Sequence, residues 1–130
     1  MRRTPLKRTS GLARSGRLKP MSDKKVAGID ARAEIREEVF KRDGRKCLFS
    51  GYVESFLSFP ESPADLVVEL EGCLLIGLRC FGELSVHHVI KSSAGGPYRA
   101  DNLITLCHRH NGFAEEHPAL AAAMGLVVRR

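Results

Sequence analysis

The chain has 130 residues, enough for one domain with a modest core and too few for two independent domains. Lysine and arginine total 21 against 15 acidic residues, a net charge of +6. Seven of these bases and no acid lie in residues 1–20, so the rest of the chain holds 14 bases and 15 acids. A nearly neutral body with a basic arm indicates a polyanionic partner, nucleic acid first and an anionic membrane surface second.

The apolar segments argue against a transmembrane or exported protein. The longest strongly apolar stretch, residues 73–78, has six residues and includes Gly77, whereas a membrane-spanning helix needs about 20. The first twenty residues lack the apolar region of a secretory signal. We therefore expect a cytoplasmic protein with no membrane partner.

Cysteine and histidine content favours a metal site. The four cysteines fit two disulfides in an oxidising compartment, but metal ligation is the better expectation in a reducing one. Four of the five histidines lie between His87 and His110, which strengthens the metal interpretation.

The N-terminal part predicts an arm followed by a helix. Leucines recur every six residues in residues 1–20, which is neither a helical nor a strand period, so we predict a disordered basic arm over 1–24. It serves either as a solubilising tail or as a contact to the phosphate backbone. Residues 29–42 place Ile35, Val39 and Phe40 on one helical face, with Asp30 as the N-cap and Gly44 as the stop signal.

Residues 51–79 differ in composition, with five acids against one base. Pro60 and Pro63 interrupt an otherwise apolar, strand-prone sequence. We predict an insertion that forms a β-hairpin, with strands at 66–70 and 73–78 and a turn at Glu71–Gly72.

The remaining chain predicts the order strand, loop, strand, helix. We expect strands at 84–90 and 103–106, separated by a loop that contains Gly95-Gly96-Pro97, and a helix beginning within 107–110. Pro118 ends this helix or opens another, because residues 119–124 have high helix propensity before Gly125.

Polar residues gather on these last elements. His87 and His88 are adjacent in a strand and therefore point to opposite faces, so one can bind a metal while the other faces a substrate. Asn102 stands at the entry to the second strand. Asn111 and Glu115 are four residues apart and so share one face of the following helix.

Residues 84–90 (LSVHHVI), the Gly-Gly loop and residues 101–111 (DNLITLCHRHN) resemble the HNH endonuclease family, the ββα-metal nucleases. The resemblance covers about residues 42–47 and 80–118. It implies an HNH nuclease domain of α+β class over residues 25–130, in which a small ββα-metal core is joined by the N-terminal helix and by the β-hairpin insertion over 51–79. The disordered basic arm over 1–24 precedes this domain. The arm and the ending GLVVRR are similar to small HNH proteins of bacteriophages, so a phage-infected bacterial host is one expected setting.

The resemblance implies a role for each matching residue. His88 would be the general base that takes a proton from water, and His87 would ligate a divalent cation on the scissile phosphate. Asn102 would tie the loop between the strands and so orient the base. Asn111 would be the second metal ligand, and Glu115 a possible carboxylate ligand. This oxygen-rich set favours magnesium or manganese over zinc.

The resemblance also implies a structural zinc, because many HNH proteins carry two Cys-x-x-Cys pairs. Here the first pair reads Cys47-x-x-Ser50 and the second Cys107-x-x-His110. We expect Cys80, returned by the insertion, to replace the missing thiol. The expected ligands are Cys47, Cys80, Cys107 and His110, with Cys73 as a spare. The alternative is that the cysteines are buried small hydrophobes.

These features predict a metal-dependent endonuclease acting on phosphodiester bonds, with double-stranded DNA as the expected partner. The alternative is a non-catalytic, zinc-stabilised module that binds nucleic acid. His88 together with two candidate metal ligands favours the nuclease, since a binding module has no physical need for them.

Overall fold

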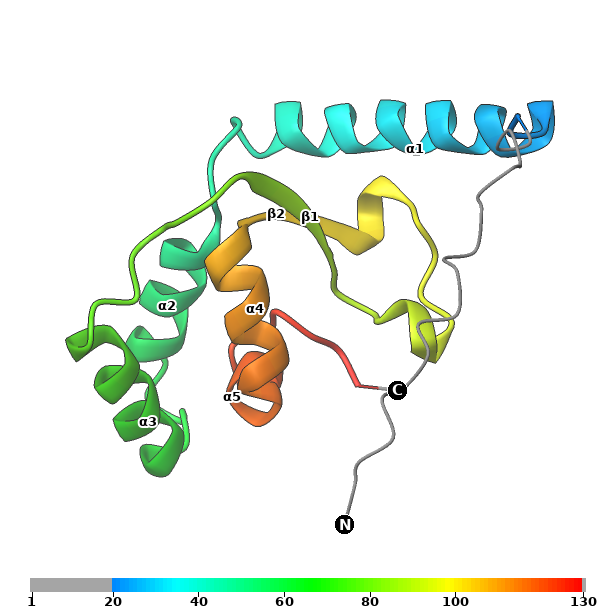
Figure 1. Ribbon diagram of the computed structural model, residues 1–130. Helices are drawn as coiled ribbons and strands as arrows, with labels where there is room; N and C mark the ends of the chain where they lie inside the picture. The colour runs from blue at the N-terminus through cyan, green and yellow to red at the C-terminus, as the bar shows by residue number, and fades with distance from the viewer. Residues whose placement is uncertain (1–19, 130) are drawn as a thin grey trace, which may run out of the picture.

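The computed structural model describes residues 20–129, so almost all of the predicted basic arm lies outside the described residues (Figure 1). The chain forms five α-helices and two β-strands in this part. In order they are α1 (Asp23–Arg42), α2 (Phe49–Ser58), α3 (Ala64–Leu75), β1 (Leu84–His88), β2 (Leu103–Cys107), α4 (His108–Glu116) and α5 (Pro118–Ala123).

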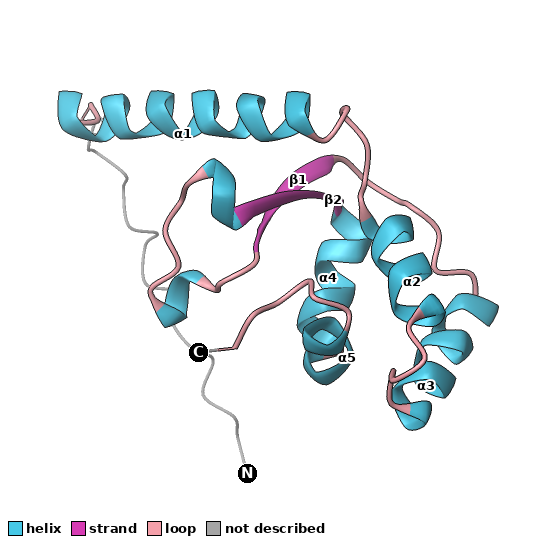
Figure 2. Ribbon diagram, turned by 180° about the vertical axis from the view of Figure 1, so that it is seen from behind, coloured by secondary structure: helices cyan, strands magenta, loops and turns pink. Residues whose placement is uncertain are grey.

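The two strands form an antiparallel sheet that is covered by helices on both faces. The register pairs Leu84 with Cys107 and His88 with Leu103. Helix α1 lies across one face of the sheet, and α4 and α5 lie on the other, as the two opposite views agree (Figures 1 and 2). The predicted order strand, loop, strand, helix is confirmed, and so is the α+β class.

The core lies between the sheet, the C-terminal helices and the α2–α3 pair. Leu70, Leu106, Leu120 and Leu126 are fully buried in it. Pro118 opens α5 rather than ending α4, which suits its missing N–H and fixed φ. After α5, Gly125 takes a left-handed φ of 82°, which turns the chain so that Leu126 returns to the core.

The insertion is a helical hairpin, so the predicted β-hairpin is wrong. Pro63 stands at the N-cap of α3, and Glu71–Gly72 lie inside this helix instead of forming a turn. The apolar residues bury one helical stripe, because Leu66, Leu70 and Cys73 face the core while Val68 is 68% exposed. None of the helices in the described part of the chain combines the length and the apolar character that a membrane span requires.

Helix α1 begins earlier than predicted, at Asp23 with Ser22 as the N-cap rather than at Asp30. Residues 23 and 24 are therefore helical and not part of an arm. The prediction relied on an apolar face, but Val39 is the helix's one fully buried residue among its 20. Good helix formers and the favourable charges of Asp23 and Lys41 at the two ends sustain the exposed turns instead.

Candidate functional site

His87 and Asn111 face each other beneath the sheet, at the end of β1 and on α4. His87 Nδ1 lies 2.7 Å from Asn111 Oδ1, and His87 Nε2 lies 3.2 Å from the carbonyl oxygen of Leu126. A neutral imidazole carries one N–H, so it donates either to Asn111 Oδ1 or to this carbonyl; the second tautomer, with the proton on Nε2, leaves a lone pair on Nδ1 for a cation. A ring nitrogen and an amide oxygen thus converge on one point. Adjacent ligands of an octahedral ion are about 3 Å apart, so this spacing suits a divalent cation.

A cavity of about 360 Å³ opens beside this pair. It is lined by His87, His88, Lys91, Asn111 and Glu115, together with Val86 and two serines of the following loop. The structure thus brings together the predicted base, both predicted ligands and the possible carboxylate ligand. Glu115 is 60% exposed and accepts a 2.7 Å hydrogen bond from Lys91 Nζ at the rim.

His88 is half-buried and lines the same cavity as His87 and Asn111. The edge of its ring meets the Tyr98 ring, with 5.5 Å between the centroids. The pKa of His88 lies below its usual 6.5, chiefly because of burial and further because of electrostatic repulsion from His87 and Arg32. The imidazole is therefore neutral at neutral pH, which is the form that accepts a proton.

Asn102 holds the loop that follows His88. Its Nδ2 donates to the carbonyl oxygens of Ile90 and Pro97, both at 3.0 Å, and its Oδ1 accepts a hydrogen bond from the Ile90 amide at 2.8 Å. Gly96 packs so tightly beneath this loop that a Cβ there would lie 1.8 Å from the Ile90 oxygen. The buried Asn102 amide thus joins the two ends of the loop between the strands.

A polar network that sequence patterns do not predict fixes α1 to the sheet. Arg42 donates to Asp43 and to the carbonyl oxygens of Ala100 and Leu103, while Asp43 accepts from the Thr105 amide at 2.9 Å. Burial opposes ionisation of Asp43, but the hydrogen bonds from Arg42 and Thr105 outweigh it and lower its pKa. In the sequence, this network shows only as an acid directly after a helix. Asp43 is therefore indistinguishable there from an ordinary turn residue.

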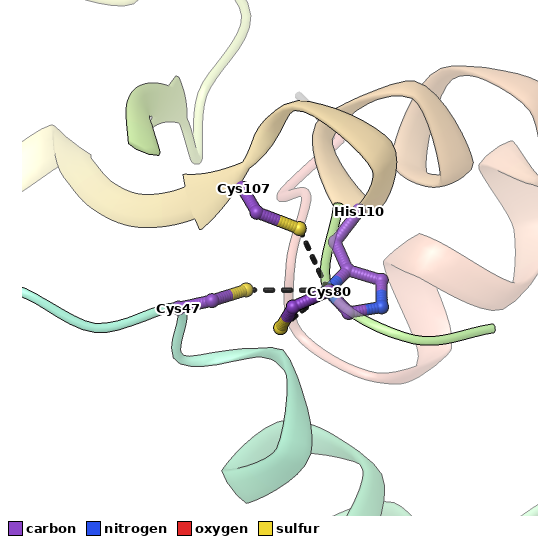
Figure 3. Close-up of side chains that lie close together, drawn as sticks. All are labelled: Cys47, Cys80, Cys107 and His110. Atoms are coloured by element: carbon purple, nitrogen blue, oxygen red, sulfur yellow. Dashed lines mark hydrogen bonds between the residues drawn. The ribbon is translucent and has the colours of Figure 1, made fainter. Parts of the chain in front are cut away.

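The four expected zinc ligands lie together at one end of the sheet (Figure 3). The sulfurs of Cys47, Cys80 and Cys107 lie 3.2, 3.7 and 3.2 Å from His110 Nδ1. All four ligand atoms lie within 4.8 Å of one another. Tetrahedral zinc, with bonds of about 2.3 Å to sulfur and about 2.0 Å to nitrogen, separates these atoms by about 3.5 Å. The cluster therefore has the size of a metal site.

The residues around the cluster orient His110 and change the pKa of Cys47. His110 Nε2 lies 3.2 Å from the Leu78 carbonyl oxygen, so its N–H donates there and Nδ1 keeps the lone pair. The Phe49 ring stacks on His110 with 3.9 Å between the centroids. Burial raises the pKa of Cys47 to about 11, with the neighbouring thiols adding to the rise. A bound cation would remove this cost, because it stabilises the thiolates.

Cys73 lies outside this cluster, as expected for the spare. Its sulfur is 4.0 Å from His117 Nε2, and His117 Nδ1 is 2.8 Å from the carboxylate of Glu69.

Comparison with known proteins gives one family. Residues 73–112 match the model of the HNH endonuclease family. Searches of curated proteins and of solved structures returned no significant match. The matched segment includes both strands, His87, His88, Asn102 and Asn111, whereas α1 and α2 lie outside it. Residues 73–112 of this chain are therefore similar to the HNH endonuclease domain.

Proposed function

We propose that this protein is a metal-dependent endonuclease that hydrolyses phosphodiester bonds in double-stranded DNA. The observation that supports it most is the position of a neutral, half-buried His88 beside the converging His87–Asn111 pair. This arrangement offers a proton acceptor and a cation site within one cavity, which are the two elements that phosphodiester hydrolysis needs.

In the proposed reaction, His88 takes a proton from a water molecule as the water oxygen forms a bond to phosphorus. The bond from phosphorus to the leaving oxygen breaks, its electron pair stays on that oxygen, and the oxygen takes up a proton from solvent. Tyr98 packs on the His88 ring and Asn102 holds the loop behind it, so both fix the direction of the base. Preorganisation of this kind lowers the cost of reaching the transition state.

His87 Nδ1 and Asn111 Oδ1 would hold one divalent cation, for which magnesium or manganese is the best match because oxygen donors dominate the cavity. When bound, this ion stabilises the charge that develops on the phosphate and on the leaving oxygen. Glu115 can become a third ligand only by leaving Lys91, with which it now pairs. Lys91 would then be free to face the phosphate.

Cys47, Cys80, Cys107 and His110 would hold a structural zinc ion. A set of three sulfurs and one nitrogen, in which protein atoms fill all four coordination positions, is typical of structural rather than catalytic zinc. His110 directly precedes Asn111, so this ion would also fix the turn of α4 that carries the proposed catalytic ligand.

Incubation of supercoiled plasmid with the protein in magnesium, manganese or chelator tests the function. We expect nicked or linear DNA with either metal and none with chelator. His88→Ala should abolish the products, whereas the control His117→Gln, outside the cavity, should retain them. DNA binding without cleavage under every condition would contradict the nuclease and favour a zinc-stabilised binding module.

A further inference from the structure

Helix α1 brings a cation to the edge of the candidate active site. The guanidinium carbon of Arg32 lies 5.4 Å from the centre of the Tyr98 ring, and the same ring meets His88. Arg32 is close enough to contribute to the lowered pKa of His88. An element outside the matched HNH segment therefore reaches the proposed general base through one aromatic side chain.

Arg32 and the next arginine on this face, Arg36, both have free donors. Four residues separate them, so they lie one turn apart on the face that leads to the buried Val39. Within residues 20–129, neither guanidinium has a hydrogen bond or a carboxylate partner, whereas Arg42 pairs with Asp43 and Arg45 with Glu37. A guanidinium that stacks on a ring keeps its N–H groups available for a phosphate.

A groove follows this face of α1. It has a volume of about 460 Å³ and is lined by Arg36, Tyr98, residues 84–86 of β1 and the turn before this strand. Val86 also lines the cavity that contains His87 and His88. The groove therefore leads along β1 to the candidate active site. Its α1 side carries Arg36, and Arg32 lies over the Tyr98 ring, which also lines the groove.

The charge of helices α2 and α3 disfavours a polyanion on their side of the molecule. Five exposed acids lie on α2, α3 and their connection: Glu54, Glu61, Asp65, Glu69 and Glu71. Both views place these helices away from the N-terminal half of α1 (Figures 1 and 2). A DNA strand on the α2–α3 side would meet repulsion, whereas one along α1 would meet free guanidinium groups.

We propose that the groove between α1 and β1 is a binding site for the backbone of duplex DNA, in which Arg32 and Arg36 contact phosphates next to the one that is cut. The proposal rests on the proposed function for the identity of the substrate. Tyr98 acts as a platform that holds Arg32 beside His88 without neutralising it. The planar guanidinium suits this task, because it stacks on the ring and donates to phosphate oxygens at the same time.

The test measures affinity for a labelled DNA duplex in chelator, at several salt concentrations. Each phosphate contact contributes about 0.9 to the slope of log affinity against log salt, so Arg32→Gln and Arg36→Gln should each lower this slope by about that amount. If affinities are equal at 1 M salt, a slope lower by about 0.9 corresponds to about eightfold weaker binding of the variant near 0.1 M salt. The matched control is Lys41→Gln, which removes the same charge from another face of α1, beside Glu37 and Glu38.

Equal effects of all three substitutions, or no effect of the two arginine variants, would overturn the proposal. Absence of duplex binding by the wild-type protein would overturn it as well. Circular dichroism melting curves establish that the variants are folded, as expected for exposed side chains. Because chelator prevents cleavage, binding that depends on Arg32 and Arg36 would support the groove even if no metal produced cleavage and the nuclease proposal failed.

Discussion

At the residue scale, the candidate site places two adjacent histidines in different surroundings. His87 is buried, with Nε2 beside the carbonyl oxygen of Leu126 and Nδ1 beside Asn111 Oδ1. His88 is more accessible and keeps its ring against Tyr98. Strand alternation assigns the two imidazoles to these environments, and their environments then fix which one suits a cation and which one suits a proton.

The lowered pKa of His88 predicts the pH dependence of cleavage. Only the neutral imidazole accepts a proton, so kcat/KM should be constant near neutral pH and fall as the pH drops through a pKa below 6.5. Rates measured with saturating magnesium at each pH give this profile. Activity that rises as the solution becomes more acidic would exclude His88 as the base.

Asn102 should matter for stability as well as for activity. Asn102→Ala removes three hydrogen bonds and leaves partly buried backbone groups of Ile90 unpaired, so we expect the free energy of unfolding to fall by about 2–3 kcal/mol. Denaturant titration measures this loss. The neighbouring Asp101→Ala, whose side chain is 66% exposed, should change it by less than about 0.5 kcal/mol.

The family resemblance names His87, His88, Asn102 and Asn111 as candidates. The structure places His87, His88 and Asn111 on one cavity and Asn102 in contact with the loop that follows His88. The resemblance did not predict Arg32, Tyr98 or Lys91. These three reach the site through tertiary packing of α1 and of the loop after β1, and no local pattern distinguishes them from ordinary surface residues.

At the scale of elements, the insertion shows how short apolar runs mislead. Residues 66–70 and 73–78 are rich in branched residues and fit a strand as well as a buried helix, since a short run has no unique period. A proline fits a break between strands as well as the start of a helix, and Pro63 stands at the start of α3. The insertion still returns Cys80 to Cys47, because a helical hairpin brings its two ends together as a β-hairpin would.

Two substitutions distinguish a helix from a strand at residues 66–70. In a strand, Val68 and Leu70 would lie on the same face, but in α3 Leu70 is fully buried and Val68 is 68% exposed. Leu70→Ala should therefore cost about 2–5 kcal/mol of unfolding free energy, and Val68→Ala less than about 0.5 kcal/mol. Similar losses for both variants in urea unfolding would favour the hairpin.

At the scale of the whole molecule, the cysteine–histidine cluster joins segments that are distant in sequence. Cys47 precedes α2, Cys80 follows α3, Cys107 ends β2 and His110 lies on α4. A metal bound there would connect the insertion to the HNH core and hold α4 against the sheet. The two proposed metal sites would then be mechanically coupled through the adjacent residues His110 and Asn111.

This coupling predicts unequal effects of two cysteine substitutions. The purified protein should contain about one zinc ion per chain, and Cys80→Ser should lose zinc, thermal stability and cleavage activity together. Cys73→Ser should keep all three, because its sulfur contacts His117 and lies outside the cluster. Elemental analysis combined with melting curves tests this. Zinc loss in Cys73→Ser alone, or no zinc in the wild type, would contradict the ligand assignment.

The most direct test of the central claim compares cleavage by the wild type and His88→Ala on one labelled DNA duplex, under single-turnover conditions with magnesium. We predict a rate at least about 10²-fold lower for the variant, the usual scale for loss of a general base, with unchanged duplex binding in chelator. Equal cleavage rates for the two proteins would contradict the assignment of His88 and, with it, the proposed active site.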